Sequence, residues 1–219
     1  MSSGLERLNS IPEVEARERL LGCCSSVEWA RRLAAERPFA STEELARAAD
    51  RIWRSLPERE WLDAFAAHPR IGTSKVAGTG PADLHPPQSM GTGVKGTDLF
   101  RHSARPSGAE GTPNKSVPNF ALNKSVPNSA DRWSREEQAG TKSASPETLA
   151  NLADANREYE ERFGHIFIVC ATGRSAAEML ALLEARLHND PQTELAIAAE
   201  EQRRIMQLRL AKLLEAEGV

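Results

Sequence analysis

Apolar residues in this chain recur three and four positions apart, and the segments with this pattern begin at residues that cap helices. The clearest case is the capping box Ser41-Thr42-Glu43-Glu44, which is followed by Leu45, Ala48, Ala49, Ile52 and Trp53. Further helices are predicted to begin at Pro57, Ser134, Ser145-Pro146, Ser175 and Asp190-Pro191. No pair of alternating segments indicates a sheet. The sequence therefore predicts an all-α fold, a compact irregular helical bundle of about eight helices.

One long stretch, at about 75–131, lacks this periodicity. It is rich in Gly, Pro, Ser, Thr and Asn, and the hexapeptide Asn-Lys-Ser-Val-Pro-Asn occurs in it twice, at 114–119 and 123–128. Structureless loops longer than about 15 residues are uncommon inside compact domains. We therefore expect a single domain over residues 1–219 that carries a flexible, low-complexity insertion at about 75–131.

Composition narrows the classes of function. The formal net charge of −3 gives no sign of a basic nucleic-acid-binding face. No apolar run approaches the roughly 20 residues that span a bilayer, and the first ten residues do not resemble a signal peptide. Three cysteines, two of them adjacent, fit a reducing compartment, and the five histidines show no metal-binding spacing. We expect a cytoplasmic protein with no metal, nucleic-acid or membrane partner.

The first candidate for chemistry is His68, which precedes Pro69. Proline disfavours the α conformation for the residue before it, so the helix that carries Trp61, Leu62, Phe65 and Ala66 on its apolar side must end near His68. The partial negative charge of a helix C-terminus favours a protonated imidazole, which suits a general acid. On composition alone, a structural histidine that ends a helix is the stronger interpretation.

The second candidate is the motif Ser134-x-x-Glu137-Gln138. As a capping box it would open a helix, and the free amides of a helix N-terminus can bind an anion. Capping alone explains Ser134 and Glu137, but it does not require Gln138. Structural and functional interpretations are evenly balanced here.

Two further features are weaker. The apolar run Ile166–Ala171 is too short for a confident helix, so we expect a buried extended segment whose backbone groups bind a planar polar ligand or neighbouring loops. Arg209 lies on the inner face of the last predicted helix, with Leu195, Ala198, Gln202, Ile205, Leu208 and Leu213. It could pair with a ligand carboxylate or a structural Glu, although an extended path to solvent is the more common outcome.

Five segments, in this order, resemble one family. They are His-Pro-Arg-Ile-Gly (68–72), Trp-Ser-Arg-Glu-Glu-Gln-Ala-Gly (133–140), Tyr-Glu-Glu-Arg-Phe-Gly (159–164), Phe-Ile-Val-Cys-Ala-Thr-Gly-Arg-Ser (167–175) and Leu-Arg-Leu (208–210). The family is 2-oxo-4-hydroxy-4-carboxy-5-ureidoimidazoline (OHCU) decarboxylase. The resemblance implies an all-α, cofactor-free, commonly dimeric carboxy-lyase that forms S-allantoin in urate degradation, functionally coupled to hydroxyisourate hydrolase and urate oxidase.

The resemblance also implies roles for individual residues. His68 and Glu137 fall on the family's catalytic residues, and Arg209 falls on its C-terminal arginine, which is expected to bind substrate. Substrate contacts fall on Pro69, Ser134, Arg135, Glu136, Gln138, Phe167, Ile168, Val169, Cys170 and Ala171. In this interpretation Glu137 orients the substrate hydroxyl and helps to keep His68 protonated, while His68 acts as general acid or carries the hydroxyl proton.

The chain departs from the family at residues 75–131, because a much shorter loop is expected between the His-Pro and Ser-x-x-Glu-Gln motifs. A longer surface loop is thermodynamically tolerable, since closure costs only about 0.6 kcal/mol per doubling of length. Two alternatives to a working enzyme remain open. The chain could be a catalytically impaired family member, or a helical protein-binding module that uses this insertion.

Overall fold

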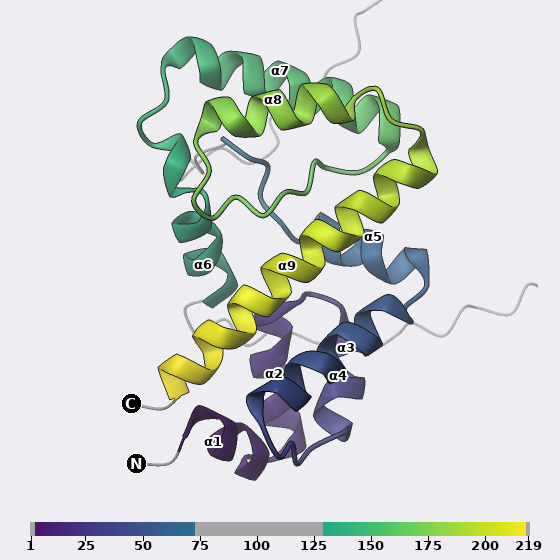
Figure 1. The fold of residues 1–219 in the computed structure, drawn as a ribbon, viewed down its shortest axis with the longest axis vertical. Helices are drawn as coiled ribbons and strands as arrows, with labels where there is room; N and C mark the ends of the chain where they lie inside the picture. The colour runs from purple at the N-terminus through teal and green to yellow at the C-terminus, as the bar shows by residue number, and fades with distance from the viewer. Residues whose placement is uncertain (1–2, 73–128, 218–219) are drawn as a thin grey trace, which may run out of the picture. The chain divides into compact units, whose positions relative to one another are not determined.

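The computed structural model describes residues 3–72 and 129–217, which belong to one compact unit. These residues form nine α-helices and one 3₁₀ helix, with no strand among them (Figure 1). The all-α prediction is confirmed. The predicted insertion at 75–131 lies outside the described residues, apart from its last three, which already belong to a helix.

Five helices precede the insertion, and serine hydroxyls cap three of them. Ser3, Ser26 and Ser41 each accept a hydrogen bond from the backbone amide three residues later. The predicted start at Ser41 is confirmed, and Pro57 directly precedes its helix. The helices are α1 (Gly4–Ser10), α2 (Glu13–Cys23), α3 (Val27–Ala35), α4 (Thr42–Arg54) and α5 (Glu58–Ala66).

Four α-helices and a 3₁₀ turn follow the insertion. Ser145 and Ser175 cap two of the helices as predicted, and Gly164 ends one of them with a left-handed φ of 73°. The elements are α6 (Ser129–Glu137), η1 (Ala139–Thr141), α7 (Pro146–Phe163), α8 (Ala176–Arg186) and α9 (Pro191–Glu217).

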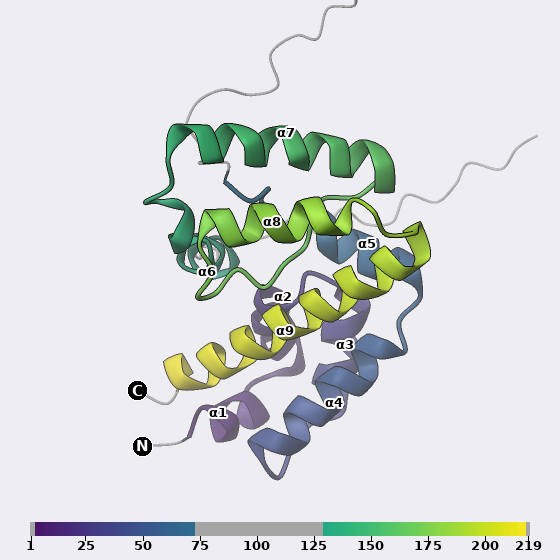
Figure 2. The same cartoon turned by 45° about the horizontal axis from the view of Figure 1, so that its top comes forward.

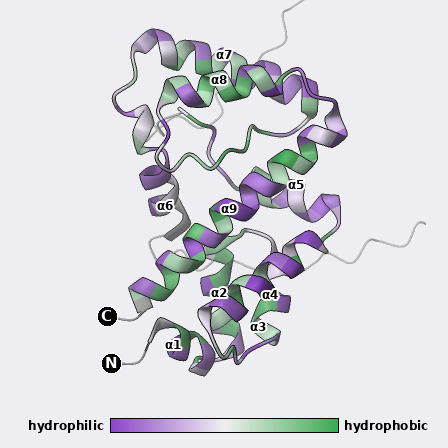
Figure 3. Cartoon of the chain, in the orientation of Figure 1, coloured by the Kyte–Doolittle hydropathy of each residue, from purple (hydrophilic) through white to green (hydrophobic). Residues whose placement is uncertain are grey.

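The long C-terminal helix α9 packs against helices from the N-terminal part of the chain. It contacts α1, α2 and α4, while α7 and α8 pack on each other and run side by side (Figures 1 and 2). The helices carry both hydrophobic and hydrophilic residues, as expected when one face is buried (Figure 3). The inner face predicted for α9 is correct for Ala198, Gln202, Ile205 and Arg209, but Leu208 is exposed.

The extended segment at 166–171 lies between two hydrophobic clusters. Its residues alternate: Ile168 packs into the cluster formed mainly by α1–α5 and α9, whereas Phe167, Val169 and Ala171 pack into the cluster of α7 and α8. This alternation is the period-2 pattern of an extended chain. The prediction of a buried extended segment is confirmed, and it places this backbone at the junction of both clusters.

The apolar side predicted for α5 is partly wrong. Phe65 is buried as expected, together with Ala64, but Leu62 is 38% exposed and Ala66 is exposed. Trp61, the other predicted apolar residue, is partly buried and packs against the core, and the chain leaves the helix toward His68 and Pro69.

Candidate active site

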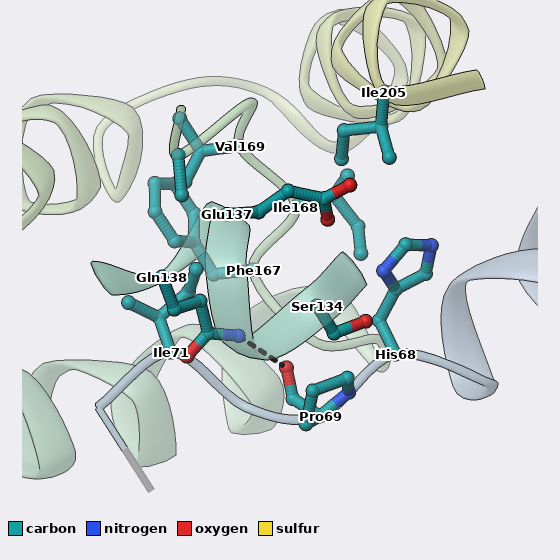
Figure 4. Close-up of a pocket in the computed structure, with 11 residues that line it drawn as sticks. His68, Pro69, Ile71, Ser134, Glu137, Gln138, Phe167, Ile168, Val169 and Ile205 are labelled. Atoms are coloured by element: carbon teal, nitrogen blue, oxygen red, sulfur yellow. Dashed lines mark hydrogen bonds between the residues drawn. The ribbon is translucent and has the colours of Figure 1, made fainter. Parts of the chain in front are cut away.

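A narrow pocket forms where four separate parts of the chain meet. The empty space in and in front of it amounts to about 330 Å³, which includes open solvent. Its walls come from the end of α5 and the residues after it, from α6, from the extended segment and from α9 (Figure 4). The lining residues are His68, Pro69, Ile71, Ser134, Glu137, Gln138, Phe167, Ile168, Val169, Ala171 and Ile205. Sequence motifs far apart along the chain are therefore assembled around one pocket.

His68 enters this pocket directly after α5. The helix ends at Ala66, and the His68 amide donates to the Phe65 carbonyl at 2.9 Å, which continues the last turn as predicted. The residue as a whole is partly exposed, but its Nε2 atom is enclosed and has no hydrogen-bond partner among the described residues.

The prediction that His68 is protonated is wrong, because its surroundings disfavour the charged imidazole. Burial lowers the pKa of the His68 imidazole to about 3, with a smaller contribution from the positive charge of Arg209. Desolvation penalises the charged imidazolium more than the helix C-terminus favours it. Glu137 does not offset this effect, because its carboxylate is paired with Arg209. At neutral pH His68 is therefore a neutral imidazole, and not the imidazolium that the sequence suggested.

Arg209, Glu137 and Ser134 form one buried polar cluster. The Arg209 guanidinium donates through Nε and Nη2 to the two carboxylate oxygens of Glu137, at 2.9 and 2.7 Å. Its Nη2 also donates to Ser134 Oγ at 2.9 Å. Arg209 and Glu137 are only 2% and 8% exposed, so an Arg side chain that reaches solvent is ruled out, and the protein partner is Glu137.

The prediction that Ser134 caps a helix is wrong. Helix α6 begins five residues earlier, at Ser129, so Ser134 and Glu137 lie in its C-terminal half, one turn apart on one face. The anion site predicted at a helix N-terminus is absent there. The same spacing of three residues instead presents a hydroxyl and a carboxylate together to Arg209.

This cluster keeps hydrogen-bonding capacity for a ligand. A carboxylate offers about four lone-pair positions, and Arg209 occupies two of those on Glu137. Ser134 Oγ accepts from Arg209, which leaves its own hydrogen to donate. In Figure 4 the Glu137 carboxylate points toward the side of the pocket where His68 and Ile205 lie.

The extended segment is anchored at alternate backbone groups. Arg186 Nη1 donates to the Ile168 carbonyl at 2.8 Å, and the Cys170 amide donates to Glu201 at 2.7 Å. Arg174 Nε donates to the Cys170 carbonyl at 3.2 Å. The amides of Ile168, Val169 and Ala171 make no hydrogen bond to another described residue. Protein neighbours thus satisfy some groups, as one interpretation predicted, and leave three donors beside the pocket.

Gln138 links the two sides of the pocket. Its amide nitrogen lies 3.5 Å from the Pro69 carbonyl, drawn as the dashed line in Figure 4, and its oxygen lies 3.4 Å from the Gly72 amide. Asn156 of α7 donates to the Ile71 carbonyl at 3.3 Å. These long hydrogen bonds hold the His-Pro-Arg-Ile-Gly turn against α6 and α7.

Four of the predicted contacts, Arg135, Glu136, Cys170 and Arg209, do not line the pocket. Arg209 is bonded to two residues that do, Ser134 and Glu137. Arg135 and Glu136 are exposed on the outer face of α6, where Glu136 lies 3.5 Å from Lys212. Cys170 points to the other side of the extended segment, into the α1–α5 and α9 cluster. Conversely, Ile71 and Ile205 line the pocket although the sequence did not single them out as contacts. The four-residue spacing between Ile205 and Arg209 is the signal that could have indicated Ile205.

Two kinds of feature are absent from the described residues. No helix in residues 3–72 and 129–217 is long and apolar enough to cross a membrane. Within the same ranges, no three His, Cys, Asp or Glu side chains are grouped so as to hold a metal ion. All three cysteines are free thiols, and two of them, Cys23 and Cys24, are buried.

Comparison with known families decides the relationship. The residue pattern of OHCU decarboxylase matches residues 9–90 and 115–211. The chain belongs to the OHCU decarboxylase family. The match extends into both ends of the predicted insertion, so that within it only residues 91–114 fall outside the family pattern.

Individual relatives agree with this family. The chain is 32% identical over 191 residues to the uric acid degradation bifunctional protein TTL of Arabidopsis thaliana, covering 87% of this chain and 45% of the relative. It is 35% identical over 86 residues to the 2-oxo-4-hydroxy-4-carboxy-5-ureidoimidazoline decarboxylase of Amia calva, covering 39% and 49%. The chain spans about half the length of these curated relatives.

Solved structures show the same fold. A crystal structure of OHCU decarboxylase in the presence of (S)-allantoin matches with a TM-score of 0.61 and 28% identity, over 90% of this chain and 98% of that one. A crystal structure of (S)-allantoin synthase matches with a TM-score of 0.57 and 16% identity, over 95% and 53%. The second likeness supports the fold alone.

Proposed function

We propose that this protein decarboxylates 2-oxo-4-hydroxy-4-carboxy-5-ureidoimidazoline to S-allantoin in urate degradation, without a cofactor. The observation that supports this most directly is the shared pocket of His68, Ser134, Glu137 and the extended segment. This chain belongs to the OHCU decarboxylase family, and the crystal structure of an OHCU decarboxylase was determined in the presence of (S)-allantoin.

The pocket offers complementary groups for a small planar ureide. The unpaired amides of Ile168, Val169 and Ala171 can donate to carbonyl oxygens of the ring and the ureido group. Phe167 supplies an apolar surface, while Ser134 and Gln138 supply further polar contacts. We assign substrate binding to these residues and to Pro69, with Arg209 acting through Glu137 and Ser134.

The reaction requires one bond to break and two protons to move. The electron pair of the bond to the carboxyl carbon enters the ring as carbon dioxide leaves, and a conjugated ring nitrogen takes up a proton from solvent, which balances the charge of the lost carboxylate. The hydroxyl on the same carbon then loses its proton as that carbon becomes a carbonyl. The neighbouring carbon gains a proton on one face, which sets the configuration of the product.

His68 and Glu137 divide this work. Of the two roles suggested by the sequence, the neutral state of His68 favours the proton carrier: the imidazole accepts the hydroxyl proton and delivers it to the ring carbon. A free lone pair of the Glu137 carboxylate orients the hydroxyl. Because His68 lies on one side of the pocket, protonation occurs on one face.

Substitution of His68 tests the assignment. His68→Gln should abolish stereoselective production of S-allantoin, measured by circular dichroism of the product, because glutamine cannot carry the proton. The matched control is His188→Gln, since His188 is an exposed histidine just after α8 whose side chain bonds to the Glu184 carbonyl, away from the pocket. The control should keep the wild-type rate. Stereoselective turnover by His68→Gln, with a wild-type melting temperature, would rule out this role.

Assembly and pathway partners belong to the same proposal. We propose a homodimer, as the family resemblance implies, and a functional coupling to hydroxyisourate hydrolase and urate oxidase. Relatives named as uric acid degradation bifunctional proteins support the coupling. Light scattering at micromolar concentration tests the dimer. The alternatives of an impaired enzyme and a helical binding module predict no turnover, so one assay of the wild-type chain separates them from the decarboxylase.

A further inference from the structure

Gln202 on α9 is a polar side chain that the reaction above does not use. It is 0% exposed, and both its amide nitrogen and its amide oxygen lack a hydrogen bond to any other described residue. A buried carboxamide with neither end bonded destabilises a fold, whereas an apolar residue of similar size would not. Its presence in the core therefore calls for a role other than packing.

Its position on α9 places it on the same face as the candidate site. Gln202 precedes Ile205 by three residues and Arg209 by seven, so all three side chains share one face of the helix. Ile205 lines the pocket together with His68, and Arg209 bonds Ser134 and Glu137. Gln202 therefore extends the row of site residues toward the enclosed side of the imidazole.

The neighbours of Gln202 indicate how its carboxamide is oriented. Burial dominates the pKa of both His68 and Cys24, and contact with Gln202 opposes it in each case: it raises the pKa of His68 and lowers that of Cys24. An amide oxygen stabilises a protonated imidazole, whereas an amide N–H stabilises a thiolate. Gln202 therefore lies beside both groups, and the enclosed His68 Nε2 and the Gln202 carboxamide are buried polar groups that each lack any other partner among the described residues. Of the two amide atoms, only Oε1 can accept from an imidazole N–H.

We propose that Gln202 is a positioning residue for His68, and that its Oε1 accepts a hydrogen bond from the enclosed Nε2–H of the imidazole. This fixes the tautomer in which Nδ1 carries the lone pair. Figure 4 shows one ring nitrogen turned toward Ser134 and Glu137 and the other turned away. The nitrogen that faces the pocket is then the one able to accept the hydroxyl proton, so this inference rests on the proposed function for its chemical consequence.

The experiment compares Gln202→Leu with the wild-type protein by two readouts. Two-dimensional ¹⁵N NMR of the imidazole should show a single Nε2–H tautomer for His68 in the wild type and a mixture in Gln202→Leu. The variant's kcat should fall at least about tenfold with KM little changed, as when a catalytic histidine loses the group that orients it. Gln202→Glu keeps an acceptor, so it should restore the single tautomer and raise the pKa of His68, with Arg209 and Glu137 still in place.

Gln207→Leu is the matched control on the same helix. Gln207 bonds to the Ala46 carbonyl and to Asp50, away from the pocket, so its loss should lower stability but leave the His68 tautomer and kcat unchanged. A Gln202→Leu protein with the wild-type tautomer would overturn the proposal, whatever its melting temperature. A wild-type protein that fails to decarboxylate would refute the proposed function. The NMR readout needs no turnover, so it would still test the hydrogen bond between Gln202 and His68.

Discussion

At the scale of single residues, the decisive feature is the buried pair of Arg209 and Glu137. Its two charged groups are almost fully removed from water and compensate each other through two hydrogen bonds. Such a pair adds little net stability compared with apolar residues, but loss of one partner leaves the other charge buried and unpaired. The pair therefore fixes where the Glu137 carboxylate lies in the pocket.

Removal of one partner should be costly. Arg209→Met is expected to lower the free energy of unfolding by about 3–5 kcal/mol, measured by urea denaturation, because Glu137 loses its counter-charge. Arg209→Met combined with Glu137→Met should recover most of this loss. Arg157→Ala, which breaks an exposed ion pair with Asp154, serves as the control and should change stability little. If the single and double variants were equally unstable, the interpretation of an unpaired charge would be wrong.

The depressed pKa of His68 predicts how stability depends on pH. Burial lowers this pKa from 6.5 in the unfolded chain to about 3 in the folded protein. Between these values the unfolded chain binds the proton and the folded protein does not, so the free energy of unfolding decreases as pH falls from about 6.5 towards 3. Above pH 6.5 the contribution is constant.

A comparison of variants isolates this effect from the carboxylates that titrate in the same range. As the pH is lowered from about 6.5 towards 3, the wild type should lose more unfolding free energy than His68→Gln does. His188→Gln should show no such shift relative to wild type. A pH-independent difference for His68→Gln would mean that His68 titrates normally in the folded protein.

At the scale of elements, the extended segment and α6 hold most of the residues that line the pocket. The ends of the helices determine where the chain turns. The segment is held by Arg186 and Glu201 from two different helices, so its backbone is fixed beside the pocket. It begins only after Gly164 ends α7 in a left-handed conformation. Correct termination of α7 is therefore a condition for the site.

Gly164→Ala should destabilise the protein by about 1 kcal/mol, because φ is positive at this position and an L side chain is strained there. An added Cβ would meet no atom within 4 Å, so the cost is conformational alone. Gly140→Ala is the contrasting variant, since its Cβ would lie 1.9 Å from the Arg174 carbonyl oxygen and the backbone must move. In thermal denaturation, Gly140→Ala should have a lower melting temperature than Gly164→Ala. The reverse order would contradict this account.

At the scale of the whole molecule, the pocket lies at the junction of the two hydrophobic clusters. Ile168 belongs to one cluster, while Phe167, Val169 and Ala171 belong to the other. A site at such a junction uses side chains from both clusters. His68 comes from the end of one helix group, and the extended segment links it to the α7 and α8 pair.

Deletion of residues 91–114 tests whether the part of the chain without a family counterpart contributes to activity. The family pattern continues on both sides of this stretch, so we expect the shortened chain to retain its melting temperature and S-allantoin production. Loss of turnover with the fold intact would instead assign these residues a part in the reaction. A control deletion is unnecessary, because the full-length chain is the reference.

Much of this protein could be predicted from local sequence. Caps at Ser41, Ser145 and Ser175 and the left-handed stop at Gly164 act over a few residues, so the sequence alone determined these helix boundaries and the all-α class. Motif order indicated the family and the pocket residues His68, Glu137 and Ile168. The failure at Ser134 has a local cause: its Ser-x-x-Glu spacing also fits two residues on one helix face.

Tertiary structure decided what depends on burial and on long-range partners. Local sequence favoured a protonated His68, but enclosure by α9 and proximity to Arg209 make it neutral, since desolvation depends on residues distant in the chain. The same holds for Arg209, whose inward position was predicted but whose partners, Glu137 and Ser134, lie more than 70 residues away. Residues that specify helices act locally, whereas charge states and ion pairs are set by the packing of the whole core.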